Sequence, residues 1–505
     1  MNLALLLTAV PGASAVKGPS DVDVSGITQD SRSVTQGALF VVVKGTKADG
    51  AAYVEDAIKR GAIAIASEDD LELDPEIVLV RVPDARRAVA LLAARLHGEP
   101  STSMAIYGIT GTNGKTTGTY LAEGIFRAAN GNPGVIGTIS YRYADVNKVA
   151  DNTTPDAVSF QKILAGMRDA GVTHVAMDVS SHALDQARVD GTAFDVVAFT
   201  NLTRDHLDYH GDMESYFRSK RRLFADLLGE SPKSPRAAVV NIDDPRGKDF
   251  AAAAPVGVRV VTYGRDPAGG ADVRPLEVDM SENGIRARFA TPLGSLRLDS
   301  PLVGAYNLSN LLCATAVGIA FGIGLGAIDA GLSGNQGAPG RLERVANAKG
   351  VTVLVDYAHT PDALENVLQA VKGFAPGRIL TVFGCGGDRD RTKRPLMGGI
   401  ACRLSDVAIV TSDNPRTENP EEIVEEIVKG CLGQRFTAIE EARTDRGYIV
   451  EVDRRAAIHA AAKIAQRGDV VVIAGKGHED YQIIGSTKHH FDDREEAAKA
   501  FGGAA

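Results

Sequence analysis

The chain has 505 residues, with 55 Lys and Arg against 64 Asp and Glu, which gives a formal charge of −9. At roughly 150 residues per domain, this length predicts about three domains. A composition of 44% apolar and 24% charged residues excludes collagen-like, coiled-coil and wholly disordered proteins. The negative charge argues against nucleic acid or a lipid surface as a partner, so any anionic ligand needs a local site.

The four cysteines, Cys313, Cys385, Cys402 and Cys431, form no CxxC pair. Their spacing argues against a zinc ribbon or a disulfide framework and fits a reducing cytoplasm, so we expect small buried hydrophobic residues. The apolar run 1–15 imitates a secretory leader but lacks a basic start, and we interpret it as the first helix of the fold. No apolar stretch elsewhere reaches the roughly 18 residues that span a bilayer.

The first segment, residues 1–100, mixes short β-branched runs with helical stretches. Strands are expected at 39–43, 62–66 and 77–80, and helices at 53–60 and 85–96. The pattern predicts a small N-terminal α/β domain that ends in the turn-rich link 98–102.

The second and third segments, residues 101–338 and 339–505, both alternate strands with helices. Strands are expected at 105–109, 174–179, 195–200, 351–355, 379–383, 407–411 and 470–474, and a helix at 120–129. Repeated β–α units predict a mostly parallel, doubly wound sheet in each segment, the central one of the P-loop type and the C-terminal one Rossmann-like. The acidic run Glu418–Glu426 is interpreted as a solvated helix face.

The strongest local motif is Gly108-Ile-Thr-Gly-Thr-Asn-Gly-Lys-Thr-Thr117, directly after a predicted strand. Its glycines let backbone amides curl around phosphate oxygens, Lys115 can reach the β- and γ-phosphates, and the Thr116 hydroxyl can hold Mg²⁺. A strict Walker A motif needs glycine where Ile109 stands. A Gly-rich turn without a ligand remains the alternative.

Two further motifs follow predicted strands, Met177–His182 and Thr200–His210. Their side chains should gather beside the phosphate loop, at the carboxyl edge of the sheet. There Asp178 could complete a Mg²⁺ site, and His206 could bind a second cation or a phosphate. The alternative for each is a hydrogen-bonded polar residue at a strand end.

The ordered series of motifs resembles the Mur ligase family of peptidoglycan synthesis, and the similarity covers the whole chain. The motifs that carry it are Asp30–Arg32, Lys44–Gly50, Gly111–Thr117, Asn152–Thr154, Val179–His182, Asn201–His210, Ala305–Asn310, Pro339–Glu343, Asp356–Pro361, Gly384–Asp390, Asp413–Arg416 and Gly475–Glu479. The resemblance implies an N-terminal domain for a UDP-sugar (1–100), a central ATP-binding domain (101–338) and a C-terminal amino-acid domain (339–505).

For ATP and its metal, the resemblance implies residues on the central domain and at the domain junction. ATP would contact Gly111, Thr112, Asn113, Gly114, Lys115, Thr116, Thr117, Asn307, Asn310 and Arg341, and Mg²⁺ would contact Thr116, Asp178, His206 and Lys220. Lys115, Lys220 and His206 would be catalytic, with Lys220 carried as a carbamate; without the family, Lys220 would be interpreted as an exposed helix residue. The family usually has Glu where this chain has Asp178. Asp356 and His359 would shape the nucleotide site after domain closure; the alternative is a capped helix start at Asp356 to Asp362.

For the UDP-linked substrate and the amino acid, the resemblance implies two further sets. The first is Ser31, Thr46, Lys47, Ala48, Asn152, Thr153, Thr154, Ser180, Gln186 and Arg188; the second is Arg389, Asp413, Asn414, Pro415, Arg416, Gly475 and Glu479. The second resembles the version that accepts meso-diaminopimelate, because a guanidinium can hold the distal carboxylate that lysine lacks. Surface placement of Ser31 and pairing of Arg416 with a nearby acid are the alternatives.

The resemblance therefore implies a Mg²⁺-dependent ligase that uses ATP as co-substrate to extend UDP-N-acetylmuramoyl-L-alanyl-D-glutamate through an acyl phosphate. We expect domain closure during catalysis and a cytoplasmic monomer with no nucleic-acid or membrane partner. Two rivals are a folylpolyglutamate synthase-like amide ligase and a nucleotide-gated regulatory protein.

Overall fold

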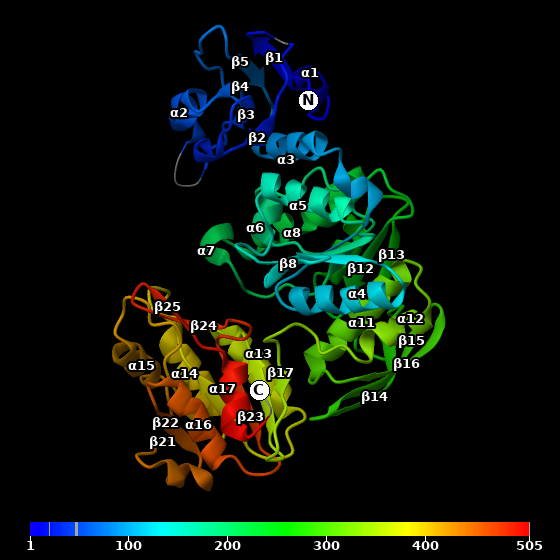
Figure 1. Ribbon diagram of the computed structural model, residues 1–505. Coiled ribbons are helices and arrows are strands. Elements are labelled where there is room, and N and C mark those ends of the chain that lie inside the picture. The colour runs from blue at the N-terminus through cyan, green and yellow to red at the C-terminus, as the bar shows by residue number, and fades with distance from the viewer. Residues whose placement is uncertain (20, 46–48, 504–505) are drawn as a thin grey trace. The chain divides into compact units, whose positions relative to one another are not determined.

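The computed structural model describes residues 1–19, 21–45 and 49–503 (Figure 1). The chain divides into two compact units, each interrupted in sequence. The first comprises Met1–Arg274, Thr291–Gly294 and Leu312–Gly331, and the second comprises Pro275–Ala290, Ser295–Leu311 and Leu332–Ala505. The N-terminal and central sheets both lie in the first unit, so the boundaries at residues 100 and 338 stay predictions.

The N-terminal sheet confirms the predicted small α/β domain. Its five strands run in the order β1 (Ser14–Lys17), β5 (Val78–Arg81), β4 (Ala62–Ser67), β3 (Ala38–Val41) and β2 (Gly26–Thr28). All neighbours are parallel except β1 and β5. Separate hydrophobic clusters join the sheet to α1 (Leu3–Leu7) with α3 (Ala85–Leu96) and to α2 (Val54–Lys59). The opening run is thus helical at α1.

The central sheet has eight strands in the order β13 (Arg259–Tyr263), β12 (Ala237–Asn241), β11 (Val196–Phe199), β6 (Ala105–Thr110), β10 (His174–Asp178), β7 (Pro133–Ile136), β8 (Ser140–Tyr143) and β9 (Val146–Val149). The first six are parallel, and β8 and β9 add an antiparallel edge. Because β6 lies between β10 and β11, the segments that follow these three strands meet at one edge.

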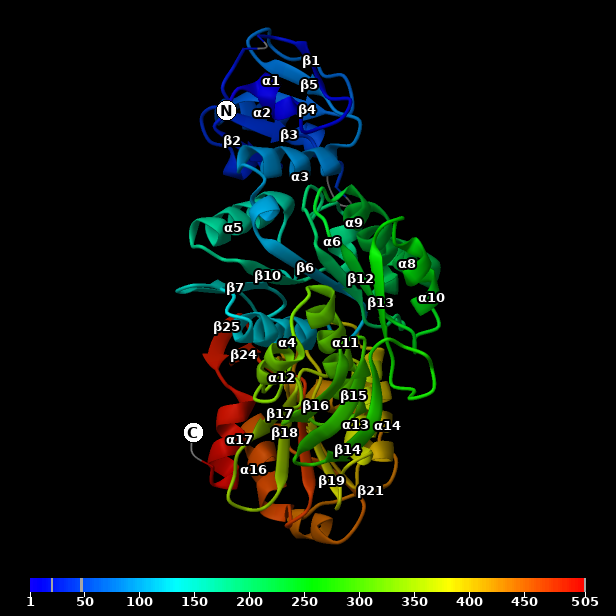
Figure 2. The ribbon, with the colours of Figure 1, turned by 90° about the vertical axis from the view of Figure 1, so that its right-hand side faces the viewer.

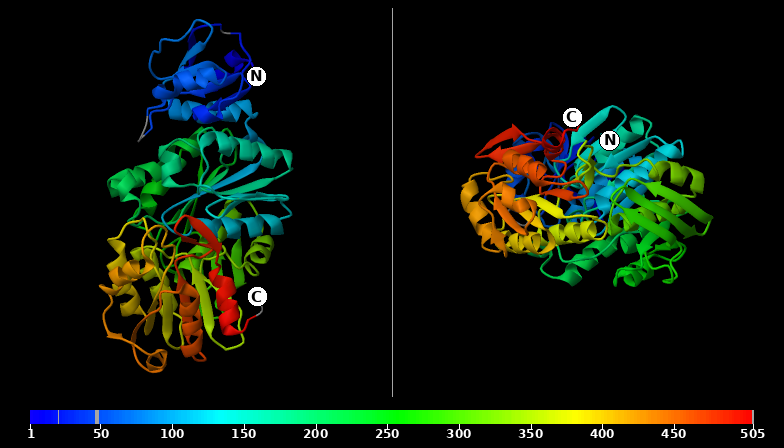
Figure 3. Two further views of the ribbon diagram at one scale, coloured as in Figure 1. Left: turned by 60° about the vertical axis from the view of Figure 1, so that its left-hand side comes forward. Right: turned by 90° about the horizontal axis from the view of Figure 1, so that it is seen from below.

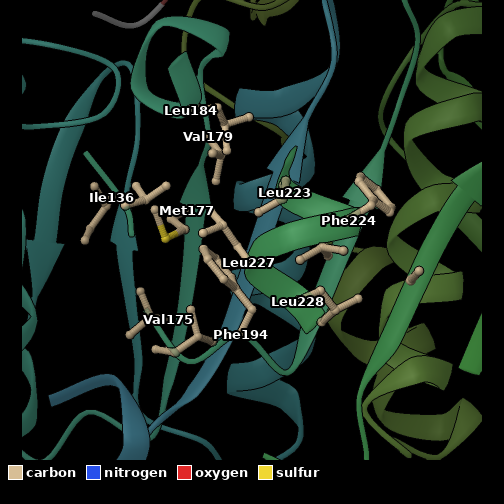
Figure 4. Packing of buried hydrophobic residues seen from close by; sticks show 14 of the residues in the cluster. Ile136, Val175, Met177, Val179, Leu184, Phe194, Leu223, Phe224, Leu227 and Leu228 are labelled. Atoms are coloured by element: carbon tan, nitrogen blue, oxygen red, sulfur yellow. The ribbon is translucent and has the colours of Figure 1, made fainter. Parts of the chain in front are cut away.

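A buried cluster fixes a helical segment against this sheet. Met177 and Phe194 pack in one cluster with Leu223, Leu227 and Leu228 (Figure 4). Leu223 and Leu227 belong to the π-helical turn η4 (Leu223–Leu227) and Leu228 to α9 (Leu228–Glu230), and both elements continue from α8 (Met213–Arg222) without a break. The packing therefore fixes the last turn of α8, which carries Lys220.

The remaining elements of this part of the chain are mostly short. The helices are α4 (Lys115–Ala128), α5 (Ala157–Asp169), α6 (Ser181–Asp185), α7 (Leu207–His210), α10 (Gly247–Ala253), α11 (Ala305–Ala320) and α12 (Leu325–Leu332), with 3-10 turns η1 (Ser31–Ser33), η2 (Gly50–Tyr53) and η3 (Pro100–Ser103). Sequence patterns missed the antiparallel sheet of β14 (Arg274–Ser281), β15 (Gly284–Thr291) and β16 (Gly294–Ser300).

The C-terminal sheet has seven strands in the order β17 (Glu343–Val345), β18 (Thr352–Asp356), β23 (Val470–Ala474), β19 (Ile379–Phe383), β20 (Val407–Val410), β22 (Gly447–Val450) and β21 (Gln434–Arg435). Only β17 is antiparallel to its neighbour. This arrangement confirms the predicted open α/β domain. A separate hairpin joins β24 (Tyr481–Ile484) and β25 (Thr487–His490).

Helices cover both faces of the C-terminal sheet (Figure 2). One cluster contains apolar residues of α13 (Pro361–Lys372), α14 (Lys393–Leu404) and α15 (Pro420–Val428). The other contains residues of α16 (Arg454–Ile464) and α17 (Asp493–Phe501), which lie side by side as the orange and red helices of Figure 3. The short turn η5 (Ile439–Arg443) completes the unit.

The acidic run Glu418–Glu426 is only partly a solvated face. The Arg394 guanidinium, fully buried on α14, donates to Glu418 at 2.8 Å and to Glu426 at 2.8 Å. The contact with Arg394 lowers the pKa of Glu418 to about 2. The prediction was wrong for these two residues because they pair with a buried arginine. The acidic run by itself does not show that such a partner exists.

The cysteines are less uniform than predicted. Cys313 and Cys385 are buried, whereas Cys402 and Cys431 are half-buried. The Cys431 thiol donates to the Ile427 carbonyl at 3.8 Å, within the same segment of the chain. Across the described ranges, no helix is both long and apolar enough to cross a membrane.

Candidate functional site

The phosphate loop lies between β6 and α4, and α4 begins at Lys115, five residues earlier than predicted. Gly114 makes this start possible, since it adopts φ 88° at the N-cap. At Gly111, which has φ 144°, a Cβ atom would lie 1.9 Å from the Thr200 hydroxyl. Thr200 in turn donates to the Asn113 carbonyl at 2.7 Å. The end of β11 thus holds the loop in the curled form that a phosphate needs.

Two lysine amines converge on one carbonyl of this loop. Lys115 Nζ donates to the Gly111 carbonyl oxygen at 2.7 Å, and Lys220 Nζ donates to the same oxygen at 2.8 Å. Lys220 is 1% exposed, so it is not the exposed helix residue of the alternative interpretation. Burial, followed by repulsion from Lys115, lowers the pKa of Lys220 well below its usual value. The loop therefore brings the amine of Lys115 next to a second amine, that of Lys220, whose protonation is disfavoured.

Asp178 lies at the end of β10, fully buried beside the first turn of α4. Its carboxylate accepts hydrogen bonds from the hydroxyls of Thr116 at 2.9 Å and Thr138 at 3.0 Å. Burial raises the pKa of Asp178, and Lys115 partly opposes the shift. The structure brings the predicted metal residues Thr116 and Asp178 together.

These oxygens fit Mg²⁺, which prefers hard ligands and usually keeps only one or two protein carboxylates beside phosphates and water. Within the described ranges, no group of three or more His, Cys, Asp or Glu side chains forms a metal cage. The donor set thus suits a metal that arrives with a nucleotide.

His206 lies in a cluster of aromatic side chains near the two lysines. Its ring centroid is 4.8 Å from that of His182 and 6.3 Å from that of Tyr216. Lys220 Nζ lies 4.6 Å from the Tyr216 ring centroid. Burial, then repulsion by His206, lowers the pKa of His182 to about 4. Burial also lowers the pKa of His206. Both rings are thereby kept neutral, the form that binds a metal. The sequence analysis gave His182 no role, although it stands in a quoted motif.

The residues predicted for the muramoyl-dipeptide adjoin Asp178. The Thr154 hydroxyl donates to the Asp178 carbonyl at 2.8 Å and lies 3.3 Å from the Ser180 hydroxyl. Arg188 donates to the Thr154 carbonyl at 2.9 Å and to Gln186 Oε1 at 2.7 Å. In the same loop, the Thr153 hydroxyl lies 3.3 Å from that of Thr138, and the Asn152 carbonyl accepts from Tyr141.

A cleft of about 640 Å³ in the first unit brings Ser31 to the same site as Gln186 and Arg188. Ser31 is buried rather than part of an exposed turn. Tyr53 and Arg86 also line the cleft, and sequence reasoning missed both because neither stands in a recognised motif. The predicted contacts Thr46, Lys47 and Ala48 lie outside the described residues.

The second unit holds the other residues predicted for ATP. Asn310 donates its side-chain amide to that of Asn307 at 2.9 Å, so the two share one face of α11. The Arg341 guanidinium lies 4.9 Å from the centre of the Tyr357 ring. Asp356 ends β18, and α13 begins at Pro361 behind its N-cap Thr360, so a capped helix start does lie within residues 356–362, as the alternative interpretation had it. His359 donates its Nδ1–H to the Tyr357 carbonyl at 2.7 Å.

Arg416 is held in an unusual backbone conformation within the predicted amino-acid motif. It has φ 51°, a region that costs a non-glycine residue free energy. The hairpin fixes this geometry, since Arg416 N–H donates to Ile483 at 3.0 Å and Gly485 N–H donates to the Arg416 carbonyl at 2.7 Å. Its guanidinium donates to the Gly387 carbonyl at 2.7 Å, a neutral acceptor. Among the described residues, no carboxylate lies within ion-pair distance of Arg416, contrary to the acid-pairing alternative.

The other residues of this motif surround Arg416 or Glu479. A Cβ on Gly386 would lie 2.8 Å from the Arg416 guanidinium and 3.9 Å from Arg389, and one on Gly387 would lie 1.9 Å from the Pro415 carbonyl. Asn414 donates to Glu479 at 3.0 Å. Burial, followed by repulsion from Asp413, raises the pKa of Glu479. Gly475 has φ 122°, and a Cβ there would lie 3.3 Å from the Asp413 carboxylate.

Substitution Gly111→Ala should weaken nucleotide binding by more than about tenfold, since the methyl group would displace Thr200 and open the loop. Isothermal titration with ADP measures the effect. Gly326→Ala on α12 is the matched control, because a Cβ there meets nothing within 4 Å. Equal ADP affinity for Gly111→Ala and wild type would show that the loop does not bind phosphate in this form.

The sequence matches three family models in order: "Mur ligase family, catalytic domain" over residues 23–97, "Mur ligase middle domain" over 109–318, and "Mur ligase, glutamate ligase domain" over 340–477. A relative from Geobacter metallireducens, UDP-N-acetylmuramoyl-L-alanyl-D-glutamate–2,6-diaminopimelate ligase, is 50% identical, with 98% of this chain and 97% of the relative covered.

Two solved structures are similar in fold. One is a UDP-N-acetylmuramoyl-L-alanyl-D-glutamate–2,6-diaminopimelate ligase, with a TM-score of 0.73, 32% identity and 98% of each chain covered. The other is the folylpolyglutamate synthase of Mycobacterium tuberculosis, complexed with ADP and AMPPCP, with a TM-score of 0.61, 18% identity and coverage of 83% of this chain and 95% of that one. At that identity the second shows the fold alone. On the three family models and the full-length relative, the chain belongs to the Mur ligase family.

Proposed function

We propose that the chain joins meso-diaminopimelate to UDP-N-acetylmuramoyl-L-alanyl-D-glutamate and converts ATP to ADP and phosphate. The observation that carries the choice of amino acid is Arg416, a guanidinium whose hydrogen-bond partner at 2.7 Å is a neutral carbonyl. A carboxylate makes stronger, bidentate hydrogen bonds with a guanidinium than a carbonyl does. Diaminopimelate has such a carboxylate at its remote end, and lysine does not.

In the proposed reaction, the side-chain carboxylate of D-glutamate attacks the γ-phosphorus of ATP and forms an acyl phosphate with loss of ADP. The amine of diaminopimelate then attacks the acyl carbon, and phosphate leaves. Lys115 and the loop amides bind the triphosphate and offset the charge that develops on it. Mg²⁺, held by Thr116, Asp178 and His206, would neutralise phosphate charge. Catalysis on this route is positioning and electrostatics.

The remaining residues are proposed to bind the UDP-linked substrate next to the phosphate loop. Ser31, Tyr53, Arg86 and Arg188 line the cleft, where cationic side chains suit the diphosphate of a UDP-sugar. Thr154 and Ser180 lie between this cleft and Asp178, so they would hold the peptide end near the phosphate loop. We extend the proposal to a cytoplasmic location, because ATP and the UDP-linked substrate are cytoplasmic, and to a monomer.

A ligation assay with the purified chain tests the proposal. Diaminopimelate, lysine, ornithine and lanthionine are supplied separately with ATP, Mg²⁺ and the UDP-linked dipeptide, and the mass of the product is read. We expect a product with diaminopimelate and ADP release that requires both other substrates, and no product from Lys115→Ala. ADP release that needs neither the UDP-linked dipeptide nor diaminopimelate would favour a nucleotide-gated regulatory protein. Extension of a folate by glutamate would favour a folylpolyglutamate synthase-like ligase.

Substitution Arg416→Met should raise the KM for diaminopimelate by about tenfold to a hundredfold, because the remote carboxylate loses a charge-assisted partner. Arg416→Lys should restore little, since an ammonium lacks the planar fork. Steady-state kinetics with varied diaminopimelate measure both. Arg403→Met is the control, since Arg403 pairs with Glu365 on the exposed part of α14. An unchanged KM in Arg416→Met would remove the basis for the amino-acid assignment while leaving the ligase intact.

We propose that Lys220 carries a carbamate in the active protein. A neutral amine is the form that reacts with CO₂, and burial favours the neutral amine of Lys220. The amine adds to CO₂ and loses a proton, and the carbamate would supply an anionic oxygen ligand suited to Mg²⁺. Carbon-13 NMR with labelled bicarbonate should show a carbamate resonance that Lys220→Met lacks, and CO₂ depletion should lower activity reversibly. Identical spectra for the two proteins would contradict this modification.

A further inference from the structure

A buried ammonium lies directly behind the residues proposed to bind the amino acid. Lys476 has no exposed surface, and it lies between the end of β23 and the β24–β25 hairpin. Its Nζ donates to the Tyr481 carbonyl at 2.7 Å and to Asn414 Oδ1 at 3.0 Å, and lies 3.2 Å from Asp413 Oδ1. The Tyr481 and Asn414 oxygens accept hydrogen bonds from the ammonium, and the Asp413 carboxylate is its ion-pair partner.

The Lys476 ammonium fixes which way the Asn414 side chain points. Asn414 Oδ1 accepts from Lys476 Nζ and also from the Ile483 N–H at 2.9 Å. Because donors meet the oxygen, the amide nitrogen must face the other way, where it donates to Glu479 Oε2 at 3.0 Å. An apolar residue at 476 would leave a single donor on Oδ1 and would weaken this preference.

Lys476 also balances two carboxylates, that of buried Asp413 and that of half-buried Glu479. Asp413 Oδ1 is 3.2 Å and Glu479 Oε2 is 4.0 Å from its Nζ. Asp413 Oδ1 is buried and has no well-directed hydrogen bond, so the ammonium is its nearest compensation. Two carboxylates with Lys476 and Arg416 sum to zero charge, which suits a remote end that carries one ammonium and one carboxylate.

We propose that Lys476 is a positioning residue for amino-acid selection: it orients the Asn414 amide and neutralises Asp413, so that Glu479 stays a carboxylate facing the remote ammonium of the diamino diacid. Lys476 itself does not touch the substrate. The inference rests on the proposed function and adds to it a residue that acts from behind the binding surface.

The variant Lys476→Met keeps the length of the side chain and removes its charge and donors. It should raise the KM for diaminopimelate by about tenfold or more, with the KM values for ATP and the UDP-linked dipeptide within about twofold of wild type. Lys463→Met is the matched control, because Lys463 lies in the same unit and makes a surface ion pair with Glu440. Loss of a residue needed only for folding would not selectively raise the KM for diaminopimelate while leaving the other two KM values unchanged.

The pH dependence of kcat/KM for diaminopimelate is a second test of the role of Lys476. Lys476 lowers the pKa of Asp413 and opposes the rise that burial and Asp413 cause in the pKa of Glu479. Loss of Lys476 should therefore raise both pKa values and move the acid limb of kcat/KM for diaminopimelate to higher pH. Arg454 and His359 also face Asp413, and Arg416 faces Glu479. These groups remain in the variant, so the displacement reports the missing ammonium.

Two outcomes overturn the inference: an unchanged KM for diaminopimelate in Lys476→Met, or equal increases in all three KM values. If Lys476→Met does not fold, Lys476→Gln, which keeps an N–H donor without the charge, enters the same comparison with the same criteria. Failure of the wild type to ligate diaminopimelate would refute the proposed function instead, so the two failures are distinguishable.

Discussion

The convergence of two amines on the Gly111 carbonyl is the constraint around which the first unit is organised. Lys115 and Lys220 reach the same oxygen at 2.7 and 2.8 Å, one from the first turn of α4 and the other from the last turn of α8. Like charges at such a distance repel, and the repulsion is relieved only by an anion or by loss of a proton. The buried leucines that follow Lys220 hold α8 in place against this repulsion.

Much of this arrangement follows from the sequence. Parallel strands are recognisable from buried β-branched runs, and the order of β6, β10 and β11 then brings Thr116, Asp178 and the Thr200 loop to one edge. Glycine spacing predicts the phosphate loop because φ values such as 144° at Gly111 are accessible to few other residues. These features are local in sequence or follow from regular topology.

Other parts of the site depend on contacts that no local pattern encodes. Arg86 lies on α3, yet it lines a cleft with Arg188, about a hundred residues away. Glu418 and Glu426 look like surface acids until the buried Arg394 meets them. The burial of Lys220 is equally invisible in a helix whose neighbours include Arg218, Arg221 and Arg222. Each case depends on which distant segment covers a charge, and a single sequence does not carry that information.

In the second unit, the charged residues that stabilise the fold differ from those proposed to bind the amino acid. Arg454 and Asp493, both without exposed surface, join α16 to α17 through hydrogen bonds of 2.6 and 2.7 Å. Removing one partner of such a pair leaves an uncompensated charge, so the pair binds the C-terminal helix firmly to the sheet. Arg416 and Glu479, by contrast, are held by loops and by the hairpin that follows β23.

The β24–β25 hairpin has a consequence for how such proteins diversify. It is a two-stranded sheet of its own, separate from the seven-stranded sheet, and β25 is exposed along its length. Its backbone hydrogen bonds fix the backbone conformation of Arg416. None of its residues belongs to the two hydrophobic clusters of the C-terminal sheet. Substitutions in this hairpin can therefore change which amino acid the enzyme prefers to add to the cell-wall precursor without destabilising the C-terminal sheet.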